Sequence, residues 1–202
     1  AGIFAQTIGF NSANTTVGLA DDLTKGILDR FRSLPMSSSA VVLGRTTSDI
    51  VRGLITLIVL IFTGLAVGWR IHNGLPKAVL AVALLLFFGF ALSWIAAWIG
   101  LYMPNTEVAN TAGLIWLFPL TFLSNSFVPL DTYPAWLQTI AEWNPLSSVV
   151  LAMRQLFGNP VGPPVGGFPQ TQPFAYSLLS CVVILLVFVP LAVRKYRRSS
   201  SR

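Results

Sequence analysis

The sequence predicts an all-α integral membrane protein, folded as a polytopic helical bundle. Hydrophobic residues make up 54% of the 202 residues and charged residues only 10%, whereas soluble domains carry about 25% charged residues. A chain this short cannot bury so much apolar surface in a water-soluble core, so lipid is its natural solvent. The length favours one domain, residues 1–202.

Four apolar runs are long enough for membrane-spanning helices, which need about 20 mostly apolar residues each. A fifth run, residues 2–20, is uncharged but contains several amide and hydroxyl side chains. We therefore expect about five spans, over residues 2–20, 50–68, 78–101, 108–128 and 174–193.

The basic residues predict the orientation of the chain in the membrane. They cluster between the first two runs (Lys25, Arg30, Arg32 and Arg45) and after the last one (Arg194, Lys195, Arg197, Arg198 and Arg202). Basic loops stay in the cytoplasm, so we expect both clusters there, with four spans between them and the C-terminus cytoplasmic. Because the clusters flank apolar runs, the net charge of +6 indicates membrane orientation and no nucleic-acid partner.

The cytoplasmic segment between the first two runs predicts a short amphipathic helix over residues 22–34. Its apolar residues recur at helical spacing, acidic residues precede it, and Pro35 ends it. Such a helix either lies on lipid headgroups or docks a cytoplasmic partner.

On the external side, residues 134–157 predict a helical hairpin that re-enters the membrane or lies in its outer leaflet. Trp136, Ile140 and Trp143 share one face, and Asn144 followed by Pro145 begins a second helix with a cap and an N1 proline. A surface hairpin without a transport role is the alternative. A loop rich in glycine and proline, residues 158–173, follows.

Polar residues inside the predicted spans are the candidates for a substrate path. Polar groups in a membrane face protein or water. A helical stripe that contains Asn11 and Asn14 favours packing between helices, and the alternative is that these residues line the substrate path. Ser124 and Asn125 favour the cap of a helix end, and the alternative is an outer gate. Glu107 suits the first turn of a helix, but Glu107 and Asp49 are also candidates for proton coupling.

The sequence lacks the motifs that are typical of several functional classes. There is no GxxxxGK[ST] phosphate loop, HExxH or GxSxG motif, so we expect no catalytic site and no bound cofactor in this chain. The single histidine, His72, and the single cysteine, Cys181, predict no metal site.

Two stretches of the chain carry ordered motifs. The first, KGILDRFRSLPMSSSAVVLGR, begins at Lys25, and the second contains Pro-Asn-x-Glu from Pro104, Phe-Pro-Leu-x-Phe-Leu-Ser-Asn from Phe118, Val-Pro from Val128 and Trp-Asn-Pro from Trp143. With these motifs in this order, the chain resembles the permeases of type-2 ABC exporters, in the daunorubicin-resistance branch. It departs from the family pattern at Ile27, where the family has threonine.

The resemblance implies a subunit with six spans, of which the first, with an amphipathic helix before it, is not visible here. It implies a second permease subunit, identical or related, and cytoplasmic ATP-binding subunits that hold ATP and Mg²⁺. It places the complex in a bacterial plasma membrane, among membrane lipids. The segment 22–34 corresponds to the coupling helix that contacts the ATPase, through Asp22, Leu23, Lys25, Ile27, Arg30, Phe31, Arg32 and Leu34.

The expected function is therefore that of a permease subunit that moves an amphiphilic drug or lipid outward. A lipid-linked polysaccharide exporter is the nearest alternative within the ABC class. A proton-coupled secondary carrier and a non-transporting scaffold or immunity protein are alternatives from other classes.

Charge reversal at Arg30 and Arg32 should weaken binding of the ATPase subunit, because both cations lie on the predicted docking helix. The measurement is copurification of the ATPase with the double variant from membranes solubilised in mild detergent. Normal copurification would contradict the assignment of this helix.

Overall fold

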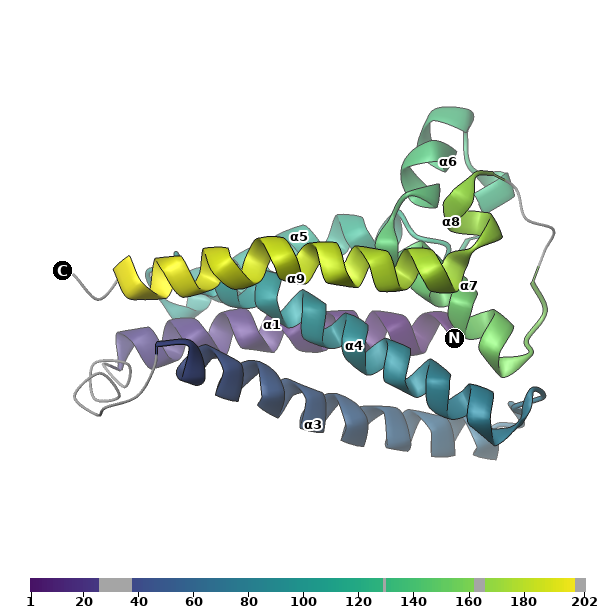
Figure 1. Cartoon of the computed structure of the whole chain (residues 1–202), viewed down its shortest axis with the longest axis horizontal. Helices are drawn as coiled ribbons and strands as arrows, with labels where there is room; N and C mark the ends of the chain where they lie inside the picture. The colour runs from purple at the N-terminus through teal and green to yellow at the C-terminus, as the bar shows by residue number, and fades with distance from the viewer. Residues whose placement is uncertain (26–37, 129, 162–165, 199–202) are drawn as a thin grey trace.

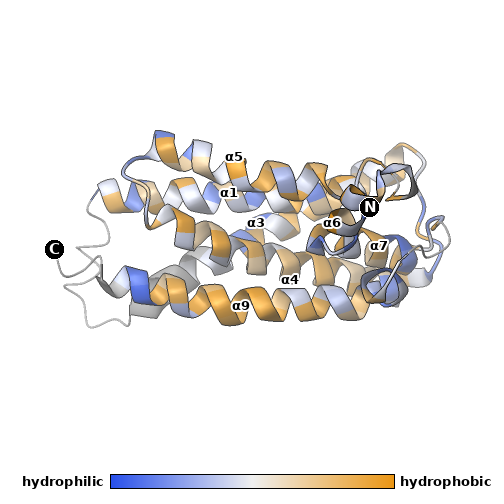
Figure 2. Ribbon diagram, turned by 90° about the horizontal axis from the view of Figure 1, so that it is seen from above, coloured by the Kyte–Doolittle hydropathy of each residue, from blue (hydrophilic) through white to orange (hydrophobic). Residues whose placement is uncertain are grey.

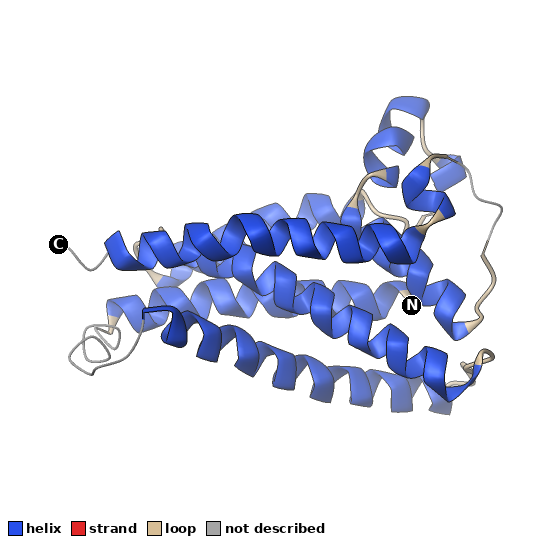
Figure 3. Ribbon diagram, in the orientation of Figure 1, coloured by secondary structure: helices blue, strands red, loops and turns tan. Residues whose placement is uncertain are grey.

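The computed structural model describes residues 1–25, 38–128, 130–161 and 166–198. Within these ranges every element of secondary structure is helical, as predicted (Figure 3). The elements are α1 (Gly2–Thr24), α3 (Ser38–Ala66), α4 (Gly74–Gly100), α5 (Thr106–Phe122), a 3₁₀ turn η1 (Leu130–Thr132), α6 (Ala135–Glu142), α7 (Pro145–Phe157), α8 (Phe168–Thr171) and α9 (Pro173–Arg198).

Five long helices (α1, α3, α4, α5 and α9) run side by side, and the shorter helices gather at one end of this bundle (Figure 1). The α3–α4 turn and the helices α6, α7 and α8 lie at that end. The end of α1, the beginning of α3, the α4–α5 turn and the end of α9 lie at the other. At this second end the Lys195 ammonium sits 3.9 Å from the centre of the Tyr102 ring. The described parts of the predicted cytoplasmic segments thus share one end of the bundle; the side of the membrane on which it lies stays a prediction.

α1 packs against α4, α5 and α3. The approach to α4 is close because glycine faces α1 at two places. A Cβ atom at Gly100 would lie 2.7 Å from the Thr16 carbonyl oxygen, and one at Gly89 would lie 2.6 Å from Ile8 Cγ2. Small residues allow this close packing where lipid gives helices no hydrophobic reason to associate.

Three of the described helices are long and apolar enough to cross a membrane: Thr46–Ala66, Gly74–Gly100 and Pro173–Tyr196. α1 is more polar than these three helices, as its mixed colours in Figure 2 illustrate. α5 has only 17 residues. Both lie parallel to the three spans, but their role as fourth and fifth spans stays a prediction.

Several predicted boundaries differ from the structure. Asp21 and Asp22 belong to the last turn of α1 and do not begin a new helix, because α1 continues without a break to Thr24. α5 ends at Phe122 and not near residue 128, since the chain turns at residues 123–128. α9 extends to Arg198, and part of the predicted loop 158–173 forms α8.

The predicted orientation can be tested with single cysteines and a membrane-impermeant thiol reagent. In a Cys181→Ser background, a cysteine at Val67, which is 85% exposed beside the α3–α4 turn, should be labelled in intact cells. A cysteine at the exposed Glu107 should be labelled only after the membrane is permeabilised. The reverse pattern would invert the topology.

Candidate functional site

One face of α1 is not covered by the rest of the described chain. α4, α5 and α3 enclose the other sides, whereas the uncovered face carries Ile3, Thr7, Phe10 and Asn14 at helical spacing. Asn14 is exposed and, among the described residues, its amide has no hydrogen-bond partner. Because lipid cannot satisfy an amide, we expect this face to meet protein or water where α1 crosses the membrane as predicted.

A row of phenylalanines extends the same face onto α5. The Phe10 ring meets Phe118 edge to face with centroids 5.9 Å apart. Phe118 then stacks on Phe122 at 5.6 Å, and Phe122 on Phe127 at 6.1 Å. Phe118, Phe122 and Phe127 are 45%, 58% and 55% exposed. The face of α1 and α5 therefore combines exposed aromatic rings with isolated amide and hydroxyl groups, a surface suited to an amphiphile.

The sequence alone does not indicate this aromatic row. The spacing of Phe118 and Phe122, one helical turn apart, is visible in the sequence. Their exposure depends on which side of α5 packs against α1. No pattern in the sequence of α5 alone predicts that side.

Asn11, a predicted path residue, lies beside this face but forms a bridge between α1 and α3. Its side-chain amide donates to Thr56 Oγ1 over 3.4 Å. One turn further along α1, the Thr15 hydroxyl donates to the Asp49 carboxylate. These two bridges connect α1 to α3 through polar side chains in an otherwise apolar bundle.

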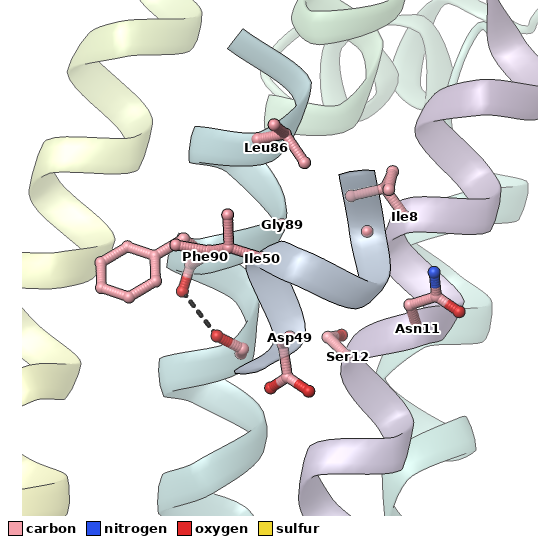
Figure 4. A pocket seen from close by; sticks show the side chains of 10 residues that line it. Ile8, Asn11, Ser12, Asp49, Ile50, Leu86, Gly89 and Phe90 are labelled. Atoms are coloured by element: carbon pink, nitrogen blue, oxygen red, sulfur yellow. Dashed lines mark hydrogen bonds between the residues drawn. The ribbon is translucent and has the colours of Figure 1, made fainter. Parts of the chain in front are cut away.

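A small cavity lies between α1, α3 and α4 beside these bridges. Asn11 and Ser12 line it from α1, Asp49 from α3, and Gly89 and Phe90 from α4 (Figure 4). Its volume of about 20 Å³ is enough for one water molecule but not for a drug-sized ligand. The cavity therefore has room for one water molecule beside the polar bridges, and it is too small to be a substrate chamber.

The other two predicted path residues, Ser124 and Asn125, lie in the turn after α5. Both side chains are buried, and the Ser124 hydroxyl donates to the Thr121 carbonyl oxygen. The backbone N–H of Asn125 donates to Ser147 Oγ, and the Arg154 guanidinium donates to the Asn125 carbonyl oxygen. The structure therefore separates these two residues from Asn11 and Asn14, and their place in a path stays a prediction.

Asn144 joins the end of α5 to the beginning of α7. Its Oδ1 accepts from the Leu146 N–H and so caps α7, as the sequence predicts. Its amide nitrogen donates to the carbonyl oxygens of Leu120 and Leu123, 2.7 and 3.2 Å away. One side chain thus satisfies backbone groups of two helices that end inside the bundle.

The predicted coupling residues are only partly described. Asp22 and Leu23 lie in the last turn of α1, and Lys25 follows it, with its ammonium 2.7 Å from the Asp21 carboxylate. The remaining members of the set, Ile27, Arg30, Phe31, Arg32 and Leu34, lie outside the described residues. The docking role of the whole set stays a prediction.

Glu107 lies in the first turn of α5 and is exposed, as its position after the capping Asn105 predicts. Among the described residues, no three histidine, cysteine or acidic side chains come close enough together to hold a metal ion.

Comparison with known proteins identifies similar membrane permeases. A family model described as ABC-2 type transporter matches residues 1–157. Daunorubicin resistance ABC transporter permease protein DrrB1 of Streptomyces coeruleorubidus is 34% identical over 202 residues, covering 99% of this chain and 68% of the relative. Probable doxorubicin resistance ABC transporter permease protein DrrC of Mycobacterium tuberculosis is 29% identical over 191 residues, covering 94% of this chain and 66% of the relative. The chain thus spans about two thirds of the length of these two relatives.

Asn144→Ala should destabilise the bundle by about 2–3 kcal/mol, because it removes a cap worth about 1 kcal/mol and two further hydrogen bonds of about 1 kcal/mol each. The measurement is thermal unfolding of the purified protein in detergent.

Two matched variants separate these contributions. Asn144→Ser keeps a capping oxygen but cannot reach α5, so its loss should be intermediate. Asn105→Ala removes only the cap of α5, formed with the Val108 N–H, and should cost about 1 kcal/mol. Equal losses for Asn144→Ala and Asn105→Ala would show that the contacts with α5 contribute nothing.

Proposed function

This chain belongs to the ABC-2 type transporter family, and on that premise we propose that it is the membrane-spanning permease subunit of an ATP-driven exporter. The proposed substrate is an amphiphilic drug or lipid, taken from the cytoplasm or the inner leaflet. The names of the relatives, which refer to daunorubicin and doxorubicin resistance, support a drug of this kind. The complex belongs in a bacterial plasma membrane, with the C-terminus of this chain in the cytoplasm.

The observation that carries the proposal is the uncovered face of α1 and α5. It presents Asn14, Thr7 and a row of phenylalanines where a lipid-facing helix would present only apolar side chains. A second permease subunit, identical or related, facing this surface would enclose a path between the two subunits. Exposed rings would contact the apolar part of the substrate, and the amide and hydroxyl groups its polar part.

The energy for transport comes from separate ATP-binding subunits on the cytoplasmic side. The sequence has no phosphate loop of its own, so ATP and Mg²⁺ belong to those partners. The segment 22–34 is the proposed contact, and it joins the inner ends of α1 and α3.

Movement of that segment would displace α1 and α3 together. The bridges from Asn11 to Thr56 and from Thr15 to Asp49 hold these two helices to each other near their midpoints. ATP binding would favour one of two arrangements of the helices, since a ligand shifts an equilibrium by its difference in affinity for the two states. The face of α1 would then be presented differently to the second subunit.

One observation favours a second candidate, the proton-coupled secondary carrier. Asp49 is a half-buried carboxylate in a membrane helix and contacts Thr15 beside the small cavity. Intramembrane carboxylates are common in proton relays. In the exporter Asp49 is a structural bridge, and its titration is not required.

Inside-out vesicles that contain the permease and its ATPase can separate the two candidates. Daunorubicin should accumulate when ATP is added, and a proton gradient without ATP should drive no uptake. Asp49→Asn removes the titratable group but keeps an acceptor for Thr15, so ATP-driven uptake should stay close to that of the unmodified chain. Uptake driven by a proton gradient alone, and abolished in Asp49→Asn, would instead establish the carrier.

A further inference from the structure

The turn between α3 and α4 contacts the end of α7 through three hydrogen bonds. The His72 N–H donates to the Phe157 carbonyl oxygen over 2.9 Å. The Asn73 side-chain amide donates to the Gln155 carbonyl oxygen over 2.7 Å, and the Trp69 indole N–H donates to Asn159 Oδ1 over 3.2 Å. Two of these acceptors are carbonyls in the last turn of α7, and the Gln155 carbonyl oxygen also accepts from the Gly158 N–H over 3.3 Å.

Asn73 is the residue before α4, where an asparagine would ordinarily cap its own helix. Its side chain makes no such cap bond and donates to α7 instead. The chain leaves α7 through Gly158, whose φ of 74° is left-handed and favours glycine. A Cβ atom there would lie 2.9 Å from His72 Cβ, so the absence of a side chain at Gly158 also allows the turn to approach.

Aromatic packing strengthens the same contact. The Trp69 ring meets Phe157 of α7 edge to face at 4.9 Å and Phe4 of α1 at 5.5 Å, and Phe4 and Phe157 lie 6.2 Å apart. Three rings from three elements therefore form one cluster at this end of the bundle. Such pairs stabilise by about 0.5–1.5 kcal/mol each beyond the area they bury.

The turn is also held firmly to α3. The Trp69 N–H donates to the Gly64 carbonyl oxygen over 2.9 Å, and the Arg70 guanidinium donates to the Leu65 carbonyl oxygen over 2.8 Å. The Trp69 ring lies against Gly64, where a Cβ atom would be 3.4 Å from Trp69 Cε3. These contacts fix Trp69 and Arg70 to the end of α3.

α3 itself is the outermost of the long helices, with many of its large apolar side chains exposed, including Phe62 at 69%. Its described polar bridges to α1 lie on either side of its midpoint, at Asp49 and Thr56. A rigid helix passes a displacement of its first turns on to its far end.

We propose that residues 69–73 are a clamp through which α3 moves α7, so that events at the cytoplasmic end change the position of the outer hairpin. Trp69 and Asn73 are then positioning residues for transport. They bind no substrate and act by holding the end of α7. This inference rests on the proposed function, because it takes ATP binding by a partner as the source of the movement.

The test is hydrogen–deuterium exchange of the full chain with its ATPase subunit in lipid nanodiscs, without nucleotide and with ATP plus vanadate. In the unmodified chain, nucleotide should change exchange in both 38–66 and 145–159, the segments containing α3 and α7. In Trp69→Phe/Asn73→Ala, which removes two of the hydrogen bonds but keeps an aromatic ring, the change in 38–66 should persist and that in 145–159 should be lost. Exchange reports local opening of each segment and needs no knowledge of the substrate.

Tyr133→Phe is the matched control, because it also removes hydrogen bonds at the outer end. The Tyr133 hydroxyl lies 3.3 Å from the carbonyl oxygens of Phe122 and Ser124 and does not join α3 to α7. This variant should respond to nucleotide as the unmodified chain does.

The possible results separate the clamp from the proposed function. A nucleotide response of α7 that persists in the double variant would overturn the clamp alone, as would a response confined to 38–66 in the unmodified chain. A loss of the α7 response in Tyr133→Phe would also overturn it, because any weakening of the outer end would then suffice. Failure of any ATPase to bind would overturn the proposed function and the clamp with it.

Discussion

In lipid, every backbone N–H and C=O must find a partner within the protein, and this constraint determines how the end of the bundle that carries α6, α7 and α8 is built. Long helices satisfy their own backbone groups, but α5 and α7 end within the fold. Asparagine side chains from other elements complete those ends. Asn144 donates to two carbonyls at the end of α5, and Asn73 donates to one at the end of α7. The same bonds that satisfy the backbone thereby fix the hairpin to the long helices.

The sequence predicted the features that depend on local signals. Hydrophobic runs and the low charge predicted a helical bundle, and the pair Asn144–Pro145 predicted the cap and first turn of α7. The apolar side chains of Trp136, Ile140 and Trp143 are exposed, as their shared face predicts. These signals act over one or two turns of chain, so no other segment is needed to read them.

What the sequence did not predict depends on contacts between distant segments. α1 continues through Asp21 and Asp22 because nothing in its last turn stops it, although acidic residues also suit a helix start. The Phe10–Phe118 contact and the bond from Asn73 to Gln155 join residues far apart in the chain. Neither has a local pattern that identifies its partner. Ser124 and Asn125 read as polar residues in a span, but they lie in a buried turn of the chain.

The shortness of α5 affects the membrane as well as the protein. Its 17 residues give a helix about 25 Å long, against a hydrocarbon core of about 30 Å. The neighbouring α4, with 27 residues, is about 40 Å long. Two adjacent helices that differ this much impose a hydrophobic mismatch, which a bilayer relieves by thinning beside the shorter one. With α5 as a predicted span, the bilayer beside it is expected to be thinner than beside α4, so an amphiphile there would have a shorter apolar distance to cross.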